Sequence, residues 1–478
     1  MHDNLTREAA ALFTQAFGIR PDECVRLAGA GSDRIYFRLR GAHHTAVATY
    51  GRDASENRSF TALARIFAAH GVNVPQVYAE RADGLMYLQQ DLGDSQLFSM
   101  LESPEAEVLV ERTLCQLVRM QTVPENEWAG KVSAKPFGER LVAWDLNYFK
   151  YEFLKPAGVL FCEEALQDDF DRFAAALLEA ARIQSGFMMR DCQSRNVMVY
   201  DGSPFLIDFQ GGRKGPGLYD AVSFLWQAKA GFSPEFRSRM LARYVDMLAQ
   251  ATGADADALF AAAPMFVLFR TLQVLGAYGF RGIVERKAHF LESIPGALRN
   301  LAALVEDGVL DAYPELRRAA FAMTGDARFV PAETSGRLVV KVFSFSYKRG
   351  YPEDLTGNGG GFMFDCRAMH NPGRYAEYKP LTGLDAPVRQ FLEERGEVQP
   401  FLAAAAALVE PAVARYIERG FSSLQIGFGC TGGRHRSVYC AEATARALAE
   451  KFPEAEISLL HREQGIARTF IGGKEVRQ

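Results

Sequence analysis

Long hydrophobic runs are missing from this sequence of 478 residues. Hydrophobic residues make up 48% of it and charged residues 23%, as in ordinary soluble globular proteins. The longest apolar runs, such as 401–409, fall far short of the roughly 18 apolar residues that a membrane-spanning helix needs. We therefore expect neither a membrane protein nor a disordered or fibrous one. Residues 1–4 show no basic stretch followed by an apolar core, which predicts a cytoplasmic protein without a secretory signal.

Cysteine is scarce, and its positions form no recognisable pair. The seven cysteines are Cys24, Cys115, Cys162, Cys192, Cys366, Cys430 and Cys440. Their number is odd, they are widely spread, and no C-x-x-C pair occurs. This pattern favours reduced thiols over a disulfide framework or a structural zinc site.

A strong excess of one charge is also absent. The net charge is -4. Residues 337–478 hold 19 Lys and Arg against 16 Asp and Glu, a charge of +3, and the remaining 35 against 42 leave -7 for residues 1–336. The C-terminal part is basic too weakly for charge alone to indicate RNA as a partner.

A polar segment rich in Gly, Pro and Ser divides the chain at residues 326–336. At about 100 to 200 residues per domain, the length allows two or three domains. We therefore predict a first domain over 1–325, a linker over 326–336 and a second domain over 337–478.

Local hydrophobic patterns indicate the architecture of both domains. Strand-like runs occur at 45–50, 85–90, 338–345, 361–366, 423–428 and 456–460, and helical patterns at 105–123, 137–154, 163–184, 234–252, 265–279, 397–419 and 437–451. The first domain should hold a small sheet-bearing lobe over about 1–92 and a helical lobe over about 93–325. Alternating strands and helices predict an α/β second domain.

Asp191, Asn196 and Asp208 form the clearest candidate catalytic set. Asp191 follows an apolar run, Asn196 stands five positions later, and Asp208 ends another apolar run twelve positions further on. Phosphoryl transfer needs a carboxylate that accepts the proton of the attacking hydroxyl and oxygen ligands that hold Mg²⁺ on the nucleotide phosphates. The spacing predicts that these three side chains converge to supply that set. The alternative is that they cap turns and end a strand.

Small residues between two strand-like stretches form a candidate phosphate-binding loop. Gly29, Gly31, Ser32 and Arg34 lie in or beside it, and the backbone amides of such a loop can approach phosphates closely. We predict that these four residues bind the nucleotide, with a plain hairpin as the alternative.

A lysine that pairs with the nucleotide phosphates is missing from the following strand, residues 46–50. Three explanations stay open. Arg34, Arg38 or Arg52 substitutes for it, or nucleotide affinity is weak, or the domain is catalytically inactive.

Several further motifs of the first domain share a family resemblance. They are Gly71-Val72-Asn73-Val74-Pro75, Gln90-Asp91-Leu92-Gly93, Arg190-Asp191, Ser194-Arg195-Asn196, Asp208-Phe209-Gln210 and Gly215-Pro216-Gly217-Leu218-Tyr219-Asp220. With the loop at 28–38, they make residues 1 to about 315 resemble the aminoglycoside phosphotransferase-like kinases. Within that superfamily the resemblance is to bacterial cell-wall sugar kinases that phosphorylate N-acetylmuramate and N-acetylglucosamine at the anomeric hydroxyl.

The resemblance implies an α+β, protein-kinase-like fold with two lobes that uses ATP and Mg²⁺ to phosphorylate an amino sugar, as in peptidoglycan recycling. It makes Asp191 the catalytic base, Asn196 and Asp208 the Mg²⁺ ligands and Asp220 a structural anchor. Two departures from the family pattern, Met189 for His and Cys192 for Tyr, bear on the identity of the substrate.

A second candidate site is the Gly-rich turn that follows the strand-like run 423–428. Its backbone amides, the start of the next helix and the arginines 434 and 436 would form a concave anion site that suits a phosphate ester. Cys430 stands six positions before Arg436, which is the spacing of cysteine phosphatases. Such chemistry would also need a general acid, for which Asp365 and Asp385 are candidates.

Longer motifs give this second domain its own resemblance. They are Phe343 to Gly350 with Pro352, Phe364 to Arg367, Asn371-Pro372, Leu381 to Asp385 with Pro387-Val388, Gly429 to Tyr439 and His461-Arg462. Residues 338–464 resemble the C-terminal domain of the RNase adapter protein RapZ, which in that family binds glucosamine-6-phosphate and contacts a small RNA. The resemblance implies a sugar-phosphate site made of Asp365, Arg367, Cys430, Thr431, Gly432, Gly433, Arg434, His435, Arg436 and Ser437. Gly373 departs from it, because the family has a sugar-contacting His there.

Taken together, the motifs favour an amino-sugar kinase whose C-terminal domain binds a sugar phosphate. One alternative is a catalytically weak kinase scaffold that acts as a sugar-phosphate-gated adapter or RNA-binding regulator, and another is a kinase–phosphatase fusion that uses Cys430. The helical spacing of Trp144, Tyr148 and Tyr151 predicts core positions rather than a platform for a sugar. Arg195 and Arg213 either contact the substrate or form ion pairs. The sequence does not predict the oligomeric state.

Overall fold

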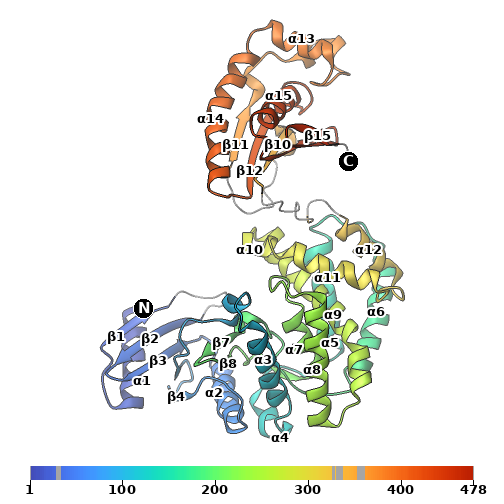
Figure 1. Cartoon of the computed structure of the whole chain (residues 1–478). Helices are drawn as coiled ribbons and strands as arrows, with labels where there is room; N and C mark the ends of the chain where they lie inside the picture. The colour runs from blue at the N-terminus through green and yellow to red at the C-terminus, as the bar shows by residue number, and fades with distance from the viewer. Residues whose placement is uncertain (1, 28–33, 326–328, 330–336, 352–360, 477–478) are drawn as a thin grey trace. The chain divides into compact units, whose positions relative to one another are not determined.

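The computed structural model describes residues 2–27, 34–325, 329, 337–351 and 361–476. The chain forms two compact units (Figure 1). The N-terminal unit comprises Met1–Glu285 and Ser293–Asp326, and the C-terminal unit comprises Arg286–Glu292 and Ala327–Gln478. Apart from residue 329, the predicted linker lies outside the described residues.

The N-terminal unit begins with a five-stranded antiparallel sheet in the order β1-β2-β3-β5-β4. The strands are β1 (Glu23–Arg26), β2 (Ile35–Gly41), β3 (His44–Tyr50), β4 (Val77–Glu80) and β5 (Met86–Gln90). Helix α1 (His2–Phe17) packs on this sheet, and its Leu12 and Phe13 share a core with Phe37 and Leu39 of β2. Helix α2 (Ala54–Ala69) contacts β4 and β5. It begins at Asp53, whose carboxylate accepts the Ser55 amide at 2.8 Å.

The rest of the N-terminal unit is mainly helical and is built around α9, an almost wholly apolar helix (Figure 1). Helices α5, α7, α8 and α11 all contact α9. The helices are η1 (Leu97–Met100), α3 (Ala106–Gln121), α4 (Glu125–Trp128), η2 (Ala129–Lys131), α5 (Glu139–Phe149), η3 (Lys150–Leu154), α6 (Glu163–Ala180), α7 (Gly217–Leu225), α8 (Pro234–Thr252), α9 (Ala256–Tyr278), η5 (Gly279–Val284), α11 (Ile294–Glu306) and α12 (Pro314–Thr324). Helix α10 (Ala288–Leu291) falls in the C-terminal unit.

Two small two-stranded sheets interrupt the helical lobe and place the candidate catalytic residues. β6 (Gly186–Met188) pairs with β9 (Arg213–Gly215), and β7 (Val197–Tyr200) pairs with β8 (Ser203–Leu206). The short helix η4 (Ser194–Asn196) lies between β6 and β7. These pairings bring the loop after β6 close to the loop after β8.

The C-terminal unit is a six-stranded sheet with helices, in the order β11-β12-β10-β13-β14-β15. The first four strands in this order are parallel, and β14 and β15 extend the β13 side of the sheet with antiparallel pairing. The elements are β10 (Val339–Ser346), η6 (Tyr347–Arg349), β11 (Gly361–Asp365), η7 (Cys366–Ala368), η8 (Pro372–Arg374), η9 (Ala376–Tyr378), α13 (Ala386–Glu394), α14 (Val398–Glu418), β12 (Ser423–Cys430), α15 (Arg436–Lys451), β13 (Glu456–His461), β14 (Ile466–Ile471) and β15 (Lys474–Val476). Helix α15 packs on β10, β12 and β13. The predicted α/β arrangement is confirmed.

Among the described residues, two helices have the length and mean hydropathy that a membrane crossing requires, Ala256–Val284, which joins α9 and η5, and Val398–Glu418. The first is 61% buried within its unit, as expected for a core helix, and the second is 17% buried. Neither is an unbroken apolar run in the sequence, because single polar or charged residues interrupt both.

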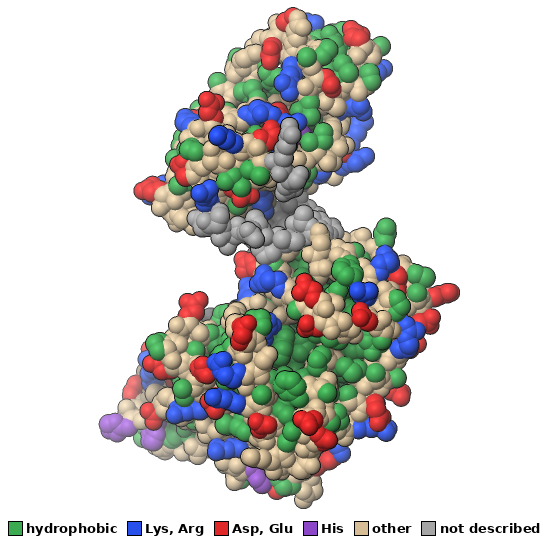
Figure 2. All heavy atoms as spheres, turned by 45° about the vertical axis from the view of Figure 1, so that its right-hand side comes forward, with side chains coloured by type: hydrophobic (Ala, Val, Ile, Leu, Met, Phe, Trp, Pro, Cys, Tyr) green, Lys and Arg blue, Asp and Glu red, His purple; other side chains and the backbone are tan. Residues whose placement is uncertain are grey.

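Basic and acidic side chains are interspersed over both units on the face that Figure 2 shows. This distribution agrees with the small net charge of each part of the sequence.

Candidate active site

The loop after β6 is held in place by Asp220 of α7. Its carboxylate accepts the Met189 amide at 2.6 Å and the Arg190 amide at 2.8 Å. Burial raises the pKa of Asp220 to about 7, although both amide hydrogen bonds oppose that rise. Arg190 takes a left-handed backbone conformation with φ of 74°, which is strained for a residue with a side chain. Asp220 therefore anchors a strained loop directly before Asp191.

The carboxylate of Asp191 is half exposed and lies beside a buried cation. Arg270 of α9 places its Nη1 atom 3.4 Å from Asp191 Oδ1, while the same atom donates to Gln273 at 2.8 Å and to the Tyr219 hydroxyl at 3.2 Å. Burial lowers the pKa of Arg270, but the neighbouring Tyr219 and Asp191 outweigh burial and raise the pKa overall, so this arginine stays charged. Arg270 therefore fixes the position of the predicted base and leaves most of its carboxylate open to an acceptor.

Asn196 and Asp208 lie together next to Asp191, as their spacing predicts. Asn196 Nδ2 donates to the Asp191 main-chain carbonyl at 2.8 Å and lies 3.3 Å from Asp208 Oδ2. Because the amide nitrogen makes these contacts, the amide oxygen is the atom that Asn196 can offer to a cation.

Asp208 provides a carboxylate that suits a divalent cation. Gln210 donates to Asp208 Oδ1 at 2.6 Å. The backbone of Asp208, with φ of 64°, is left-handed like that of Arg190. Burial raises the pKa of Asp208, and the charges of Asp191 and Glu56 raise it further. The site thus concentrates negative charge that a bound Mg²⁺ would neutralise, and its donor atoms are the oxygens that Mg²⁺ prefers.

Arg34 is the cation best placed to replace the missing strand lysine. Its Nη2 lies 3.2 Å from Glu56 Oε1 of α2, and its side chain is 11% exposed. Burial opposes its charge, but Tyr87, Glu56 and Asp208 are among the groups that raise its pKa. The other candidates face elsewhere, because Arg38 pairs with Asp94 at 2.9 Å and also with Asp91, and Arg52 is exposed. Gly29, Gly31 and Ser32 lie outside the described residues.

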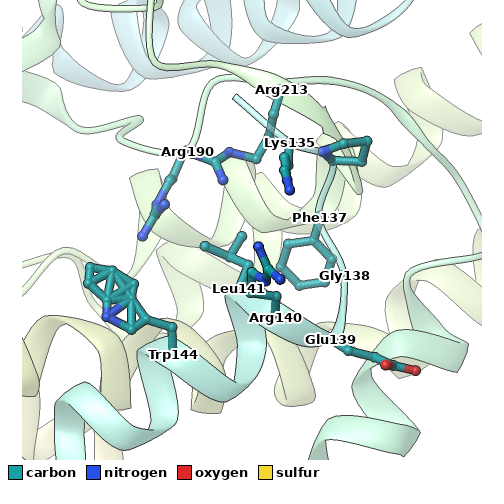
Figure 3. A pocket seen from close by; sticks show the side chains of 10 residues that line it. Lys135, Phe137, Gly138, Glu139, Arg140, Leu141, Trp144, Arg190 and Arg213 are labelled. Atoms are coloured by element: carbon teal, nitrogen blue, oxygen red, sulfur yellow. The ribbon is translucent and has the colours of Figure 1, made fainter. Parts of the chain in front are cut away.

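A cavity of about 800 Å³ adjoins the catalytic loop (Figure 3). It is lined by Lys135, Pro136, Phe137, Gly138, Glu139, Arg140, Leu141, Trp144, Arg190 and Arg213. These residues come from the segment before α5, the first turns of α5, the catalytic loop and β9. Since Arg190 directly precedes Asp191, the cavity is the natural place for an acceptor.

The predicted core positions of Trp144 and Tyr151 are wrong. Trp144 is 60% exposed and lines the cavity, Tyr151 is 50% exposed, and Tyr148 is half-buried. The reason is that α5 turns a different face toward α9, with Val142, Leu146 and Phe149 buried.

The two undecided arginines have different surroundings. Arg195 stacks on Phe98 with 4.5 Å between its guanidinium carbon and the ring centroid. Arg213 lines the cavity, which fits the prediction of substrate contact better than that of an ion pair.

In the C-terminal unit, the carboxyl ends of four parallel strands bring together Ser346, Asp365, Cys430 and His461. Ligands of parallel sheets commonly bind at this edge. The turn from β12 to α15 lies there, and Ser346 Oγ donates to the Thr431 carbonyl at 2.8 Å.

Cys430 is buried, with its Sγ atom 3.1 Å from Ser437 Oγ. Burial raises the pKa of the Cys430 thiol, but hydrogen bonds from Ser437 and the charge of Arg436 outweigh it and lower the pKa overall. Asp365 pairs with Arg367, and Asp385 accepts two hydrogen bonds from Thr382. These contacts lower the pKa of both carboxyls, which suits neither to the general acid that a cysteine phosphatase needs.

The arginines of this turn bond mainly to the protein itself. Arg436 Nη1 donates to the carbonyls of Arg367 at 3.0 Å and Met369 at 2.8 Å, and Arg434 Nη2 donates to that of Pro380 at 2.6 Å. His435 lies 2.9 Å from the Tyr378 carbonyl, and burial lowers the pKa of this histidine. Eight of the ten predicted sugar-phosphate residues, 430–437, thus form one turn, and Asp365 and Arg367 lie at the end of the neighbouring strand β11.

Sequence reasoning missed several residues around these sites. They are Glu56, Lys135, Arg140, Gln210 and Arg270. Gln210 alone carried a signal, because it belongs to the Asp208-Phe209-Gln210 motif. The others reach their sites from helices or loops far away in the sequence, so no local spacing marks them.

Comparison with known proteins identifies both parts of the chain. Residues 23–255 match the model of the phosphotransferase enzyme family, and residues 338–465 match that of the RapZ C-terminal domain. A nucleotide-binding protein of Xanthomonas axonopodis pv. citri is 42% identical over 129 residues, which are 27% of this chain and 43% of that protein. One of Acidithiobacillus ferrooxidans is 39% identical over 133 residues, 28% of this chain and 42% of that protein. The chain spans less than half the length of these relatives.

Solved structures similar to the chain include two kinases. Choline kinase LicA from Streptococcus pneumoniae has a TM-score of 0.44 and 10% identity, covering 63% of this chain and 99% of that one. Amicoumacin kinase hAmiN in complex with AMP-PNP, Ca²⁺ and Ami has a TM-score of 0.43 and 13% identity, covering 69% and 98%.

The fold class predicted for the first domain, an α+β kinase-like fold with two lobes, is confirmed by the family match and by the sheet and helical lobe of the N-terminal unit. The chain therefore carries a domain of the phosphotransferase enzyme family over residues 23–255 and a RapZ C-terminal domain over residues 338–465.

Proposed function

We propose that the chain is an ATP- and Mg²⁺-dependent phosphotransferase that acts on a hydroxyl group of an amino sugar, and that its C-terminal domain binds a sugar phosphate. The observation that carries the proposal is that Asn196 hydrogen-bonds both the main-chain carbonyl of Asp191 and the carboxylate of Asp208, next to a cavity. The family match supports phosphoryl transfer as the reaction.

Each residue of the set has one role in this proposal. Asp191, positioned by Arg270, accepts the proton of the attacking hydroxyl. Asp208 and the amide oxygen of Asn196 hold Mg²⁺, which when bound neutralises charge on the nucleotide phosphates. Arg34, paired with Glu56, holds a nucleotide phosphate in place of the strand lysine.

The choice of an amino sugar rests on the two resemblances together. One half resembles kinases of N-acetylmuramate and N-acetylglucosamine, and the other resembles a domain that binds glucosamine-6-phosphate. The turn from β12 to α15 is the place where we expect that phosphate to bind, on the backbone amides of residues 431–434 and the hydroxyl of Ser437.

A direct test measures phosphoryl transfer from Mg-ATP to a panel of N-acetylmuramate, N-acetylglucosamine, glucosamine and an aminoglycoside. We expect turnover with at least one N-acetylated amino sugar. Turnover of the aminoglycoside alone would refute the substrate class. Retained ATP binding without turnover of any sugar would favour the alternative of an adapter gated by a sugar phosphate.

A further inference from the structure

The sulfur of Cys430 lies in a setting that stabilises a negative charge. Its Sγ atom is 3.1 Å from the Ser437 hydroxyl, and the backbone amides of Ser437 and Arg434 also donate to it. Ser437 belongs to the first turn of α15, where the amide N–H groups have no acceptor within the helix. Burial raises the pKa of the Cys430 thiol, but these hydrogen bonds and the charge of Arg436 lower it overall. The turn therefore favours the thiolate form of Cys430.

Arg436 brings a buried positive charge with an unused donor to the same turn. The residue is 4% exposed, and its Nη1 donates to the carbonyls of Arg367 and Met369. Its Nε atom is buried and has no hydrogen-bond partner. A buried guanidinium N–H without an acceptor costs free energy that a negatively charged oxygen in the turn would recover.

Carboxylates at the neighbouring strand ends leave this charge unbalanced. Asp365, which ends β11, pairs with Arg367, and Glu463, which follows β13, pairs with Arg462. Within the part of the chain that the structure describes, Arg436 forms no ion pair. Its charge is therefore available to an ionised Cys430 and to an anion at that sulfur.

The outer side of the turn is open to small molecules. Thr431, Gly432 and Arg434 are exposed, and a Cβ at Gly432 would meet no atom within 4 Å. Cys430 lies at the base of the turn and is 3% exposed. This setting favours small reagents over large ones.

Other cysteines of the chain lie in settings that disfavour the thiolate. Burial raises the pKa of Cys24 and of Cys192. A hydrogen bond with Cys440, together with burial, raises the pKa of Cys366. Oxidation of thiols proceeds through the thiolate, so these settings protect their sulfur atoms.

We propose that Cys430 is a modification site, at which a hydroperoxide oxidises the sulfur to a sulfenic acid. The thiolate attacks one peroxide oxygen, an S–O bond forms and the O–O bond breaks. With hydrogen peroxide, the released hydroxide takes up a proton and leaves as water. The sulfur loses two electrons and the peroxide gains them, and a thiol reductant reverses the change. The new oxygen supplies an acceptor for the Nε–H group of Arg436.

This modification and a phosphate ester compete for the same turn. An oxygen on the sulfur fills space in which we expect the phosphate to bind, and a bound phosphate covers the sulfur. Only this competition rests on the proposed function, because the reaction of Cys430 with peroxide requires neither a kinase nor a sugar phosphate.

The first test exposes the full chain to hydrogen peroxide at pH 7 and traps sulfenic acid with dimedone. Peptide mapping by mass spectrometry then compares Cys430 with the exposed Cys162. We expect labelling of Cys430 to be faster by about tenfold. Equal or slower labelling of Cys430 would overturn the inference.

The second test follows the rate of alkylation of Cys430 by iodoacetamide between pH 5 and pH 10. In Ser437→Ala the midpoint of this profile should move up by about one pH unit, because a hydrogen bond to the thiolate is lost. The matched control is Ser423→Ala at the other end of β12, where the buried hydroxyl has no hydrogen-bond partner. A midpoint that Ser437→Ala does not move would contradict the assigned setting of the sulfur.

Glucosamine-6-phosphate separates this inference from the proposed function. At saturation it should slow dimedone labelling of Cys430 by about tenfold or more. Fast labelling of Cys430 that the sugar phosphate does not slow would support the modification site and contradict the proposed binding site. Binding of the sugar phosphate, measured by titration calorimetry, to a chain whose Cys430 does not react would do the reverse.

Discussion

Arg34 and Glu56 form the residue pair that answers the clearest objection to a kinase, the absence of a lysine from β3. A cation on the sheet that is held by a carboxylate of the adjacent helix can fix a phosphate. Arg34 meets this requirement from the position directly before β2, and the charge of Asp208 is among the causes that raise its pKa.

We predict that Arg34→Gln raises the KM for ATP by roughly tenfold to a hundredfold, because a charge-assisted contact to phosphate is lost. Steady-state kinetics with varied Mg-ATP measure this change. Arg52→Gln, at an exposed position, is the control. An unchanged KM for ATP in Arg34→Gln would contradict the proposal that Arg34 replaces the missing strand lysine.

Gly433 is the residue on which the turn after β12 depends. Its φ of 64° is left-handed, and a Cβ there would lie 2.5 Å from Glu463 Cγ and 2.8 Å from the Ser346 amide nitrogen. Gly433→Ala should lower the free energy of unfolding of the C-terminal unit by about 1–3 kcal/mol. Gly432→Ala is the matched control, since a Cβ there meets no atom within 4 Å. Urea unfolding monitored by circular dichroism measures this difference. Equal unfolding midpoints for the two variants would contradict this account of the turn.

At the scale of elements, Glu442 joins α15 to two strands of its sheet. Its carboxylate lies 3.2 Å from His461 Nε2 of β13, 3.0 Å from Arg468 Nη1 of β14 and 2.6 Å from Arg446 on its own helix. Burial raises the pKa of Glu442, but these three partners outweigh burial and lower it to about 2. A carboxyl whose pKa is lowered by folding stabilises the folded state at pH values above its ordinary pKa.

We predict that Glu442→Gln lowers the free energy of unfolding of the C-terminal unit by about 2 kcal/mol near neutral pH. The wild-type advantage should shrink as the pH falls from about 4.5 toward 2, because the carboxylate of the folded protein then takes up its proton. Urea unfolding of both proteins at several pH values measures this difference in the free energy of unfolding. A difference between wild type and variant that stays constant over this range would contradict the assigned ion network.

Individual elements show which parts of the fold the sequence predicts well. The helix predicted over 234–252 is found as Pro234–Thr252, because Ser233 caps its start, Pro234 suits the first turn and Gly253 ends it. The pattern at 265–279 belongs to a longer helix, Ala256–Tyr278, which continues through Pro264. Its apolar residues lie all around it, so hydrophobic periodicity did not mark its beginning.

The sequence predicts some residues of the candidate site and misses others. Local spacing brings Asp191, Asn196 and Asp208 together, because only the hairpin of β7 and β8 separates Asp208 from the loop that holds the other two. Arg270 and Glu56 reach the site because α9 and α2 pack beside it. No local sequence pattern predicts that packing. The exposure of Trp144 was mispredicted because a helix with aromatic residues on two faces does not reveal which face is covered.

At the scale of the whole molecule, the two units should respond separately to their ligands. All three tryptophans, Trp128, Trp144 and Trp226, lie in the N-terminal unit, so tryptophan fluorescence reports on that unit alone. A ligand present at 100 times its Kd stabilises the unit that binds it by about 2.7 kcal/mol.

We therefore predict that Mg-ATP raises the unfolding midpoint seen by tryptophan fluorescence. Glucosamine-6-phosphate should raise a midpoint seen by circular dichroism, which also reports on the C-terminal unit. If glucosamine-6-phosphate shifts only the transition seen by tryptophan fluorescence, its site lies in the N-terminal unit, which would contradict the prediction.

The most direct test of the central claim is phosphoryl transfer from Mg-ATP to N-acetylmuramate in wild type and in Asp191→Asn, with ATP binding measured in both. The account predicts that Asp191→Asn binds ATP normally while its kcat falls by about 10² to 10⁴, because the proton acceptor is gone and the Asn196 and Asp208 ligands remain. Wild-type protein that transfers no phosphate, or a variant that turns over at the wild-type rate, would contradict it.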